Sequence, residues 1–228
     1  MRAFLFGAVV VLGSLVQAEE VRDVECRFLC FGAARGASAM AVSDGGGEVK
    51  VPLYSNRLSK PVVCQAKGGE ISFVSGEDRE PMAVATVPEG VEQAVMIFHK
   101  AMPVVDEEES GEQPDEVWKV CVIGLSKENF PNGGACIANV TGSSARYDIG
   151  EHEGTIEVGK FASIAAPEER NDFNQVPVIV ETQAGDKWQK ISETPVRFVE
   201  GMQFLITVDQ AAKSGRKAIH QYKLFLGR

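Results

Sequence analysis

Histidine is scarce in this chain, which has 228 residues and three histidines. His99, His152 and His220 lie far apart, and none has a second histidine or a cysteine at the spacing of a zinc site. The sequence also lacks the Gly-x-Ser-x-Gly nucleophile elbow, the P-loop and a dinucleotide-binding glycine fingerprint after a strand. These absences argue against the enzyme classes that depend on such motifs, and the sequence assigns no catalytic, cofactor-binding or metal-binding residue.

His152 is the one histidine with acidic neighbours, because it lies between Glu151 and Glu153. Two carboxylates and an imidazole bind a metal weakly, but a hairpin turn that carries exposed charge explains the segment better. We expect His99 at the end of one strand and His220 at the start of another, with both side chains at the surface.

Basic residues are also in deficit, since 23 lysines and arginines stand against 32 acidic residues. Residues 103–116 contain no basic and 7 acidic residues, so much of the net charge of −9 comes from this one segment. Nucleic-acid binding depends on neutralisation of phosphates by Lys and Arg. The composition therefore excludes nucleic acid as a favoured partner, and it predicts that residues 103–116 are an acidic linker.

Apolar runs of membrane-spanning length are missing. The longest run follows Arg2, extends from Phe4 to Leu12, and precedes a small-residue site that ends at Ala18. This order of charge, apolar run and cleavage site is typical of a secretory signal peptide. We predict a signal peptide over residues 1–18 and an exported protein, periplasmic or extracellular, without a membrane span.

Cysteine is present in an odd number, five, so at least one thiol stays free even in an oxidising compartment. Cys121 and Cys136 lie about symmetrically around a turn near Glu128, where a hairpin would allow a disulfide. The alternative is that all five cysteines are buried as small hydrophobic residues.

Helical periodicity is lacking as well. Runs of four to eight strand-forming residues alternate instead with glycine-bearing turns, such as Lys67-Gly68-Gly69, which indicates an all-β fold. We predict two tandem immunoglobulin-like β-sandwich domains, residues 19–102 and 117–228, joined by the acidic linker. The two halves share a loose arrangement of strands, but the sequence shows no repeat strong enough to establish a duplication.

Aromatic residues suggest a ligand surface. Trp188 follows a predicted turn, and an exposed indole with Tyr147 or Tyr222 beside it would form a platform on which sugars stack. Packing in the core is the alternative for each ring. Asn139-Val140-Thr141 matches a glycosylation acceptor but lies in a predicted strand.

The segment from Phe130 to Gly142 combines a Phe-Pro-Asn-Gly turn with a strand that ends in Asn-Val-Thr-Gly, and Glu157–Lys160 forms a further turn. This pattern resembles uncharacterised exported bacterial proteins with tandem β-sandwich domains. The resemblance covers mainly residues 117–165, with weaker support from Val51 to Phe98. It implies a non-enzymatic module and carries over no catalytic residue.

We therefore expect a non-enzymatic protein that binds another envelope or secreted protein or gives structural support in the cell envelope, without a cofactor. The first alternative is a carbohydrate-binding module that recognises polysaccharide. The second is a hydrolase whose carboxylates meet only in the folded chain.

Overall fold

A computed structural model describes residues 20–32, 38–42, 47–76, 78–101, 117–211 and 215–224. These residues form β-strands, turns and irregular segments but no helix, so the predicted all-β class is confirmed. Accordingly, the described part of the chain contains no helix able to cross a membrane. The predicted signal peptide, residues 1–18, and the predicted acidic linker, residues 103–116, lie outside the described residues.

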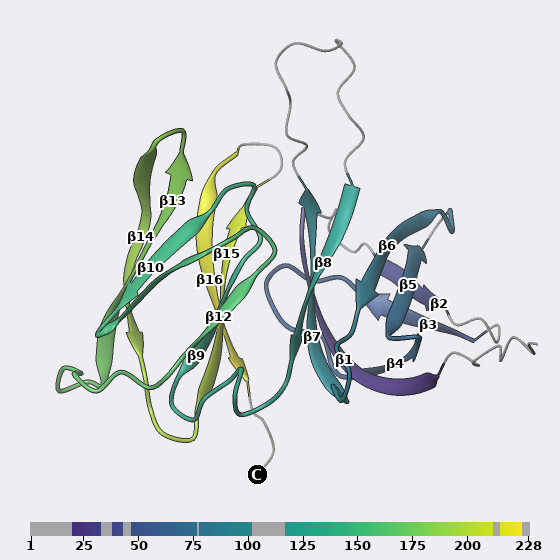
Figure 1. The fold of residues 1–228 in the computed structure, drawn as a ribbon, viewed down its shortest axis with the longest axis horizontal. Helices are drawn as coiled ribbons and strands as arrows, with labels where there is room; N and C mark the ends of the chain where they lie inside the picture. Colours follow the sequence, from purple (N-terminus) through teal and green to yellow (C-terminus); the bar gives the residue numbers. More distant parts are fainter. Residues whose placement is uncertain are drawn as a thin grey trace, which may run out of the picture.

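The strands are labelled in chain order in Figure 1. They are β1 (Val21–Phe31), β2 (Ser38–Val42), β3 (Glu48–Pro52), β4 (Val62–Lys67), β5 (Glu70–Ser75), β6 (Pro81–Thr86), β7 (Gln93–Ala101), β8 (Val117–Gly124), β9 (Ala135–Asn139), β10 (Ala145–Ile149), β11 (His152–Ile156), β12 (Phe161–Ile164), β13 (Gln175–Ala184), β14 (Lys187–Arg197), β15 (Gln203–Gln210) and β16 (Lys217–Leu224).

The first eight strands form one unit in which two layers face each other. One layer has the order β4-β1-β7-β8, and the other has the order β3-β2-β5-β6. The layers are continuous through the β4–β5 hairpin, where Lys67 pairs with Glu70. Apolar side chains from both layers fill the space between them, and the rings of Phe28, Phe73 and Phe98 contact one another there.

The last eight strands form a second unit with the same strand order. One sheet has the order β12-β9-β15-β16, and the other has the order β11-β10-β13-β14. The strands of the two units correspond in chain order, so that β1 is equivalent to β9, β2 to β10, and so on to β8 and β16. The directions also agree, because β1–β7 and β9–β15 are parallel whereas the other neighbouring pairs are antiparallel. The loose likeness in the sequence thus corresponds to one topology used twice.

Strand β8 belongs to the first unit, which corrects the predicted domain boundary. It pairs antiparallel with β7 along its whole length, so residues 103–116 connect two neighbouring strands of one sheet. The prediction placed residues 117–228 together in the second domain. An acidic segment with Pro and Gly suits a hairpin connection as well as a linker, and composition does not distinguish the two. Along the chain, the boundary between the two units instead falls between Gly124, the end of β8, and Ala135, the start of β9.

The strand order also differs from the immunoglobulin-like order that we predicted. In an immunoglobulin domain the second and third strands lie in different sheets. Here β2 pairs with β3, and β10 pairs with β11. The layered arrangement is that of packed β-sheets, but the strands are paired differently.

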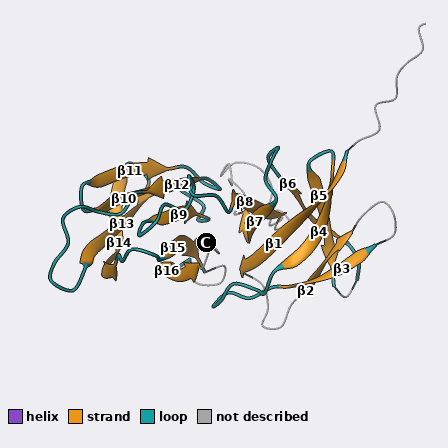
Figure 2. Cartoon of the chain, turned by 90° about the horizontal axis from the view of Figure 1, so that it is seen from below, coloured by secondary structure: helices purple, strands orange, loops and turns teal. Residues whose placement is uncertain are grey.

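The two units pack against each other through equivalent sheets (Figure 2). Side chains alternate along a strand, so Phe28 on β1 points into the first unit whereas Leu29 and Phe31 point toward the second. We call the resulting cluster the inter-unit core. It consists of Leu29, Phe31, Val95, Ile97, Cys121, Ile123, Phe130, Cys136, Ala138, Val140, Leu205, Tyr222 and Leu224.

Asn139 ends β9 and is fully buried. Its amide nitrogen donates to the carbonyl oxygens of Ser143 and Ile156, at 2.9 and 3.0 Å. Its Oδ1 accepts hydrogen bonds from the backbone nitrogen and the hydroxyl of Thr141, at 3.1 and 2.8 Å. The side chain therefore holds the turn after β9 against β11. Since it is buried and fully hydrogen-bonded, it is not accessible for glycosylation in the folded protein.

All five cysteines are buried and none forms a disulfide, which agrees with the alternative prediction. The predicted Cys121–Cys136 disulfide is absent because its hairpin does not form. β8 pairs with β7 and β9 pairs with β12 and β15, so the two cysteines come from different units and meet as thiols in the inter-unit core. Burial raises the pKa of the Cys121 thiol to about 12 and also raises the pKa of Cys136. Both thiols stay protonated and unreactive at neutral pH.

His99 is buried, at 3% exposure, which corrects the prediction of a surface side chain. It lies on β7 opposite Lys119 of β8, and its Nδ1 has no hydrogen-bond partner. Burial, with a smaller contribution from the Lys119 charge, lowers the pKa of His99 to about 4. His220 is 44% exposed and lies 3.0 Å from Asp209, whose hydrogen bond raises the pKa of His220.

These two histidines predict opposite effects of pH on stability. Between pH 6.5 and about 4 the unfolded chain binds a proton that folded His99 does not, so acidification lowers the free energy of unfolding, by roughly 2–3 kcal/mol. We expect His99→Leu to remove this acid-side loss in urea unfolding measured at pH 7.5, 6.0 and 4.5.

His220→Gln is the matched control. The raised pKa of His220 stabilises the fold below the pKa of the unfolded state, and this contribution is lost as pH rises through the folded pKa. Removing His220 should therefore make the acid-side loss steeper. An unchanged pH dependence in His99→Leu would contradict the assignment.

Candidate functional site

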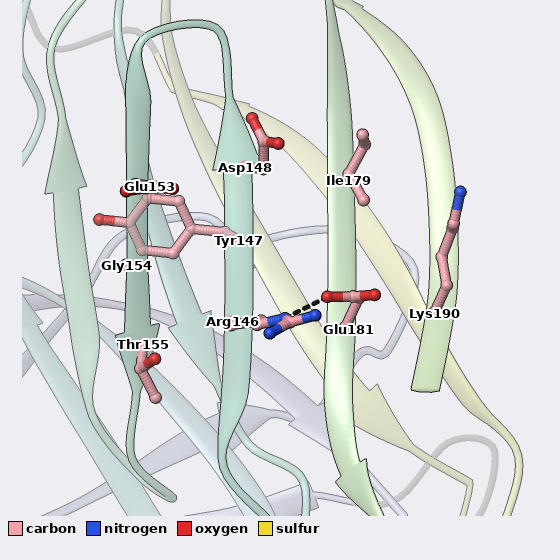
Figure 3. Close-up of a pocket in the computed structure, with 9 residues that line it drawn as sticks. All are labelled: Arg146, Tyr147, Asp148, Glu153, Gly154, Thr155, Ile179, Glu181 and Lys190. Atoms are coloured by element: carbon pink, nitrogen blue, oxygen red, sulfur yellow. Dashed lines mark hydrogen bonds and ion pairs between the residues drawn. The ribbon is translucent and has the colours of Figure 1, made fainter. Parts of the chain in front are cut away.

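The second unit carries a depression on the outward face of its β11-β10-β13-β14 sheet (Figure 3). Its volume is about 640 Å³, larger than two other depressions of about 300 and 270 Å³ on the first unit and beside the unit junction. We call it the outer trough. Its lining residues are Arg146, Tyr147, Asp148, Glu153, Gly154, Thr155, Ile179, Glu181 and Lys190.

Strand alternation places the charged residues of the outer trough on the outward face. On β10, Ala145 and Ile149 are buried in the core of the second unit, so Arg146 and Asp148 point the other way. On β13 the buried residues are Val176, Val178, Val180 and Thr182, and Ile179 and Glu181 alternate with them on the outward face.

The pairing register then brings these side chains into rows across the sheet. Arg146 lies opposite Thr155 of β11 and opposite Glu181 of β13, and Glu181 lies opposite Lys190 of β14. A register shift in the β13–β14 pair falls between Val180 and Glu181. The row therefore joins four strands and contains both positive and negative groups.

Ion pairs hold the charged groups in place. The Nε of Arg146 donates to Oε2 of Glu181, and the guanidinium lies 4.9 Å from the ring centroid of Trp188. The hydrogen bond from Arg146 lowers the pKa of Glu181, so this carboxylate stays ionised. Lys190 contacts Glu193 at 2.7 Å, and the hydrogen bond to that carboxylate raises the pKa of Lys190.

The arrangement suits recognition of a charged or polar surface. It presents oriented donors and acceptors of both signs on one face of the sheet. Among the residues that the structure describes, no group of three or more His, Cys, Asp or Glu side chains is placed to hold a metal ion. His152 begins β11 beyond a tight turn and contacts Glu151 at 3.2 Å, in agreement with the charged hairpin turn expected there.

The three predicted ligand residues are not brought together. Trp188 lies beside the outer trough, with Arg146 over one face of its indole. Tyr147 lines the trough, but its ring lies against Gly154, where an added Cβ would be 2.7 Å from the Tyr147 hydroxyl oxygen. Tyr222 belongs to the inter-unit core, is 7% exposed, and donates to the carbonyl oxygen of Ser55 at 2.7 Å. It is therefore not part of a ligand surface with the other two.

Sequence reasoning did not single out Arg146, Glu181 or Lys190. The alternation from Ala145 to Ile149 identifies which residues of β10 face outward, but the partners across the sheet depend on a register that no local pattern shows. No protein-family model matches the chain and no curated protein is similar to it, so the geometry of the trough carries the argument for function.

Proposed function

We propose that this chain is an exported, non-enzymatic binding protein built from two tandem β-sandwich domains, and that the outer trough binds a protein partner. The ion pair between Arg146 and Glu181, held on rigid strands beside Lys190, carries this proposal. Charges already oriented before binding lose little conformational freedom on association, and charge patterns of both signs give specificity for a complementary protein surface.

The aromatic rings favour a protein over a sugar. A carbohydrate platform needs a free ring face, but Arg146 lies over one face of Trp188 and the Tyr147 ring packs on Gly154. The hydrolase alternative needs a carboxylic acid that stays protonated near neutral pH. Arg146 has the opposite effect on Glu181, whose pKa it lowers.

Exchanging two charges in the outer trough tests the proposal. The double variant Asp148→Lys, Lys190→Glu reverses the local pattern but leaves the net charge unchanged. We expect at least a roughly tenfold loss of affinity for the partner, because like charges then face each other across the interface. The partner is first identified with a photo-crosslinking residue in place of Thr155, in the cell that makes the protein, and affinity is then measured with the purified partner.

Lys50→Glu is the control, because Lys50 is an exposed residue of β3 on the other unit. It should leave the affinity unchanged, and all of these exposed substitutions should change the unfolding free energy by no more than about 0.5 kcal/mol. Binding to insoluble polysaccharide that is lost in Trp188→Ala, with no protein crosslinked at position 155, would establish the carbohydrate-binding alternative instead.

A further inference from the structure

Phe173 is the most exposed large apolar side chain among the described residues, at 72%. The other large apolar side chains with high exposure are valines, at 36–58%. Full burial of a phenylalanine side chain is worth about 1.5–3 kcal/mol. Single exposed apolar residues are common, so exposure alone does not identify a site.

The two units differ in the connection that carries Phe173. In the first unit β4 and β5 are joined by the two-residue turn Gly68-Gly69. The equivalent strands of the second unit, β12 and β13, are joined by the ten residues 165–174, which project beyond the strands in Figure 1. The two-residue turn is possible because β4 and β5 pair as a hairpin, whereas β12 and β13 lie in separate sheets and the longer connection crosses between them.

The longer connection ends in a closed turn with Phe173 near its tip. Oδ1 of Asn171 accepts hydrogen bonds from the backbone nitrogens of Phe173 and Gln175, at 3.0 and 2.9 Å. Asn174 adopts a left-handed conformation, with φ of 57°, and its nitrogen donates to the carbonyl oxygen of Asn171 at 2.8 Å. The backbone that carries the ring is thus fixed before any partner binds.

The turn is also tied to the core of the second unit. The backbone nitrogen of Phe198 donates to the carbonyl oxygen of Asn174 at 2.8 Å, and Arg170 donates to the carbonyl oxygen of Phe198 at 3.0 Å. Phe198 itself is fully buried. A ring held on such a scaffold loses little entropy when it enters a pocket, which is the property of a binding anchor.

Charge defines the surroundings of the ring. Glu168, Glu169 and Asp172 are exposed in the same connection, which has one basic residue, the exposed Arg170, whose guanidinium donates to a backbone carbonyl, so the connection carries a net negative charge. An apolar ring among carboxylates is complementary to an apolar pocket bordered by lysine and arginine. The same carboxylates oppose binding to an anionic membrane surface.

We propose that Phe173 is the anchor of a second docking site, separate from the outer trough, and that it enters an apolar pocket bordered by basic side chains on a partner protein. This inference rests on the proposed protein-binding function. It adds a specific contact residue and the chemistry of the surface that receives it.

Site-specific photo-crosslinking tests the contact in the cell that makes the protein. We expect a photoreactive phenylalanine analogue at position 173 to give one discrete protein adduct, joined to a segment that contains lysine or arginine. The same analogue at Asp186, in the turn between β13 and β14, is the control and should give none. No protein adduct at 173, the same adduct at 186, or crosslinking to lipid would overturn the inference.

Affinity for the purified crosslinked partner then tests the role of the ring. Phe173→Ser should weaken binding by roughly 30-fold, and Phe173→Leu by less. The affinity should also fall as salt is raised, because the rim is charged. Equal affinity of wild type and Phe173→Ser would overturn the inference. An adduct at position 155 without one at 173 rejects this anchor but keeps the proposed function, whereas adducts at neither position reject both.

Discussion

Replacing Phe130 with alanine should lower the free energy of unfolding by about 3–5 kcal/mol, as expected for a large side chain removed from a packed core. Phe130 lies in the connection between β8 and β9 and is completely buried, with 0% exposure. It fills part of the inter-unit core, where Ile123 of the first unit and Leu205 of the second also pack. Its loss leaves a cavity between the units. Urea unfolding at neutral pH, followed by far-ultraviolet circular dichroism, measures the effect.

Phe173→Ala is the matched control for this substitution, because the same atoms are removed from a side chain that is 72% exposed. Its unfolding free energy should stay within about 0.5 kcal/mol of wild type. Similar losses in the two variants would contradict the placement of Phe130 in a buried contact between the units.

Asn139→Ala should cost about 3–4 kcal/mol, because it removes a fully hydrogen-bonded amide from the interior. The change leaves the backbone nitrogen of Thr141 and the carbonyl oxygens of Ser143 and Ile156 without this partner. Each buried polar group left unpaired costs about 1–3 kcal/mol. Thermal and urea unfolding should both show the loss.

Asn129→Ala provides the comparison, since the half-buried Asn129 side chain donates a single hydrogen bond, to the carbonyl oxygen of Gly124 at 2.9 Å. It should cost about 1 kcal/mol. Should Asn139→Ala be as stable as Asn129→Ala, the central role of Asn139 in the turn after β9 would be wrong.

Local sequence patterns were sufficient for the strands and many of their turns. Lys67-Gly68-Gly69 marks a tight hairpin because glycine adopts positive φ without strain, and both glycines do so here, at 57° and 84°. The partner of β8 was not predictable in the same way. Its residues suit the edge of either unit, and its pairing with β7 spans the long connection of residues 102–116.

The outer trough shows a similar limit. Trp188 stands out in the sequence because tryptophan is rare, and the structure does place it beside the trough. Arg146 and Glu181 are 35 positions apart, and each is an ordinary charged residue of an alternating strand. Only the register of β10 on β13 makes them an ion pair. His99 was mispredicted for the converse reason: it alternates on β7 with Val95 and Ile97, whose side chains belong to the inter-unit core, and the packing of that face does not show in the local sequence.

The packing of equivalent sheets at the centre of the molecule leaves the β3-β2-β5-β6 and β11-β10-β13-β14 layers at opposite ends of its long axis (Figure 1). An apolar contact of this kind resists relative motion of the units. We therefore expect the distance and the orientation between the two outward faces to stay nearly constant. If a partner bound both outward faces, the first contact would raise the effective concentration for the second, so that two weak contacts would reinforce one another.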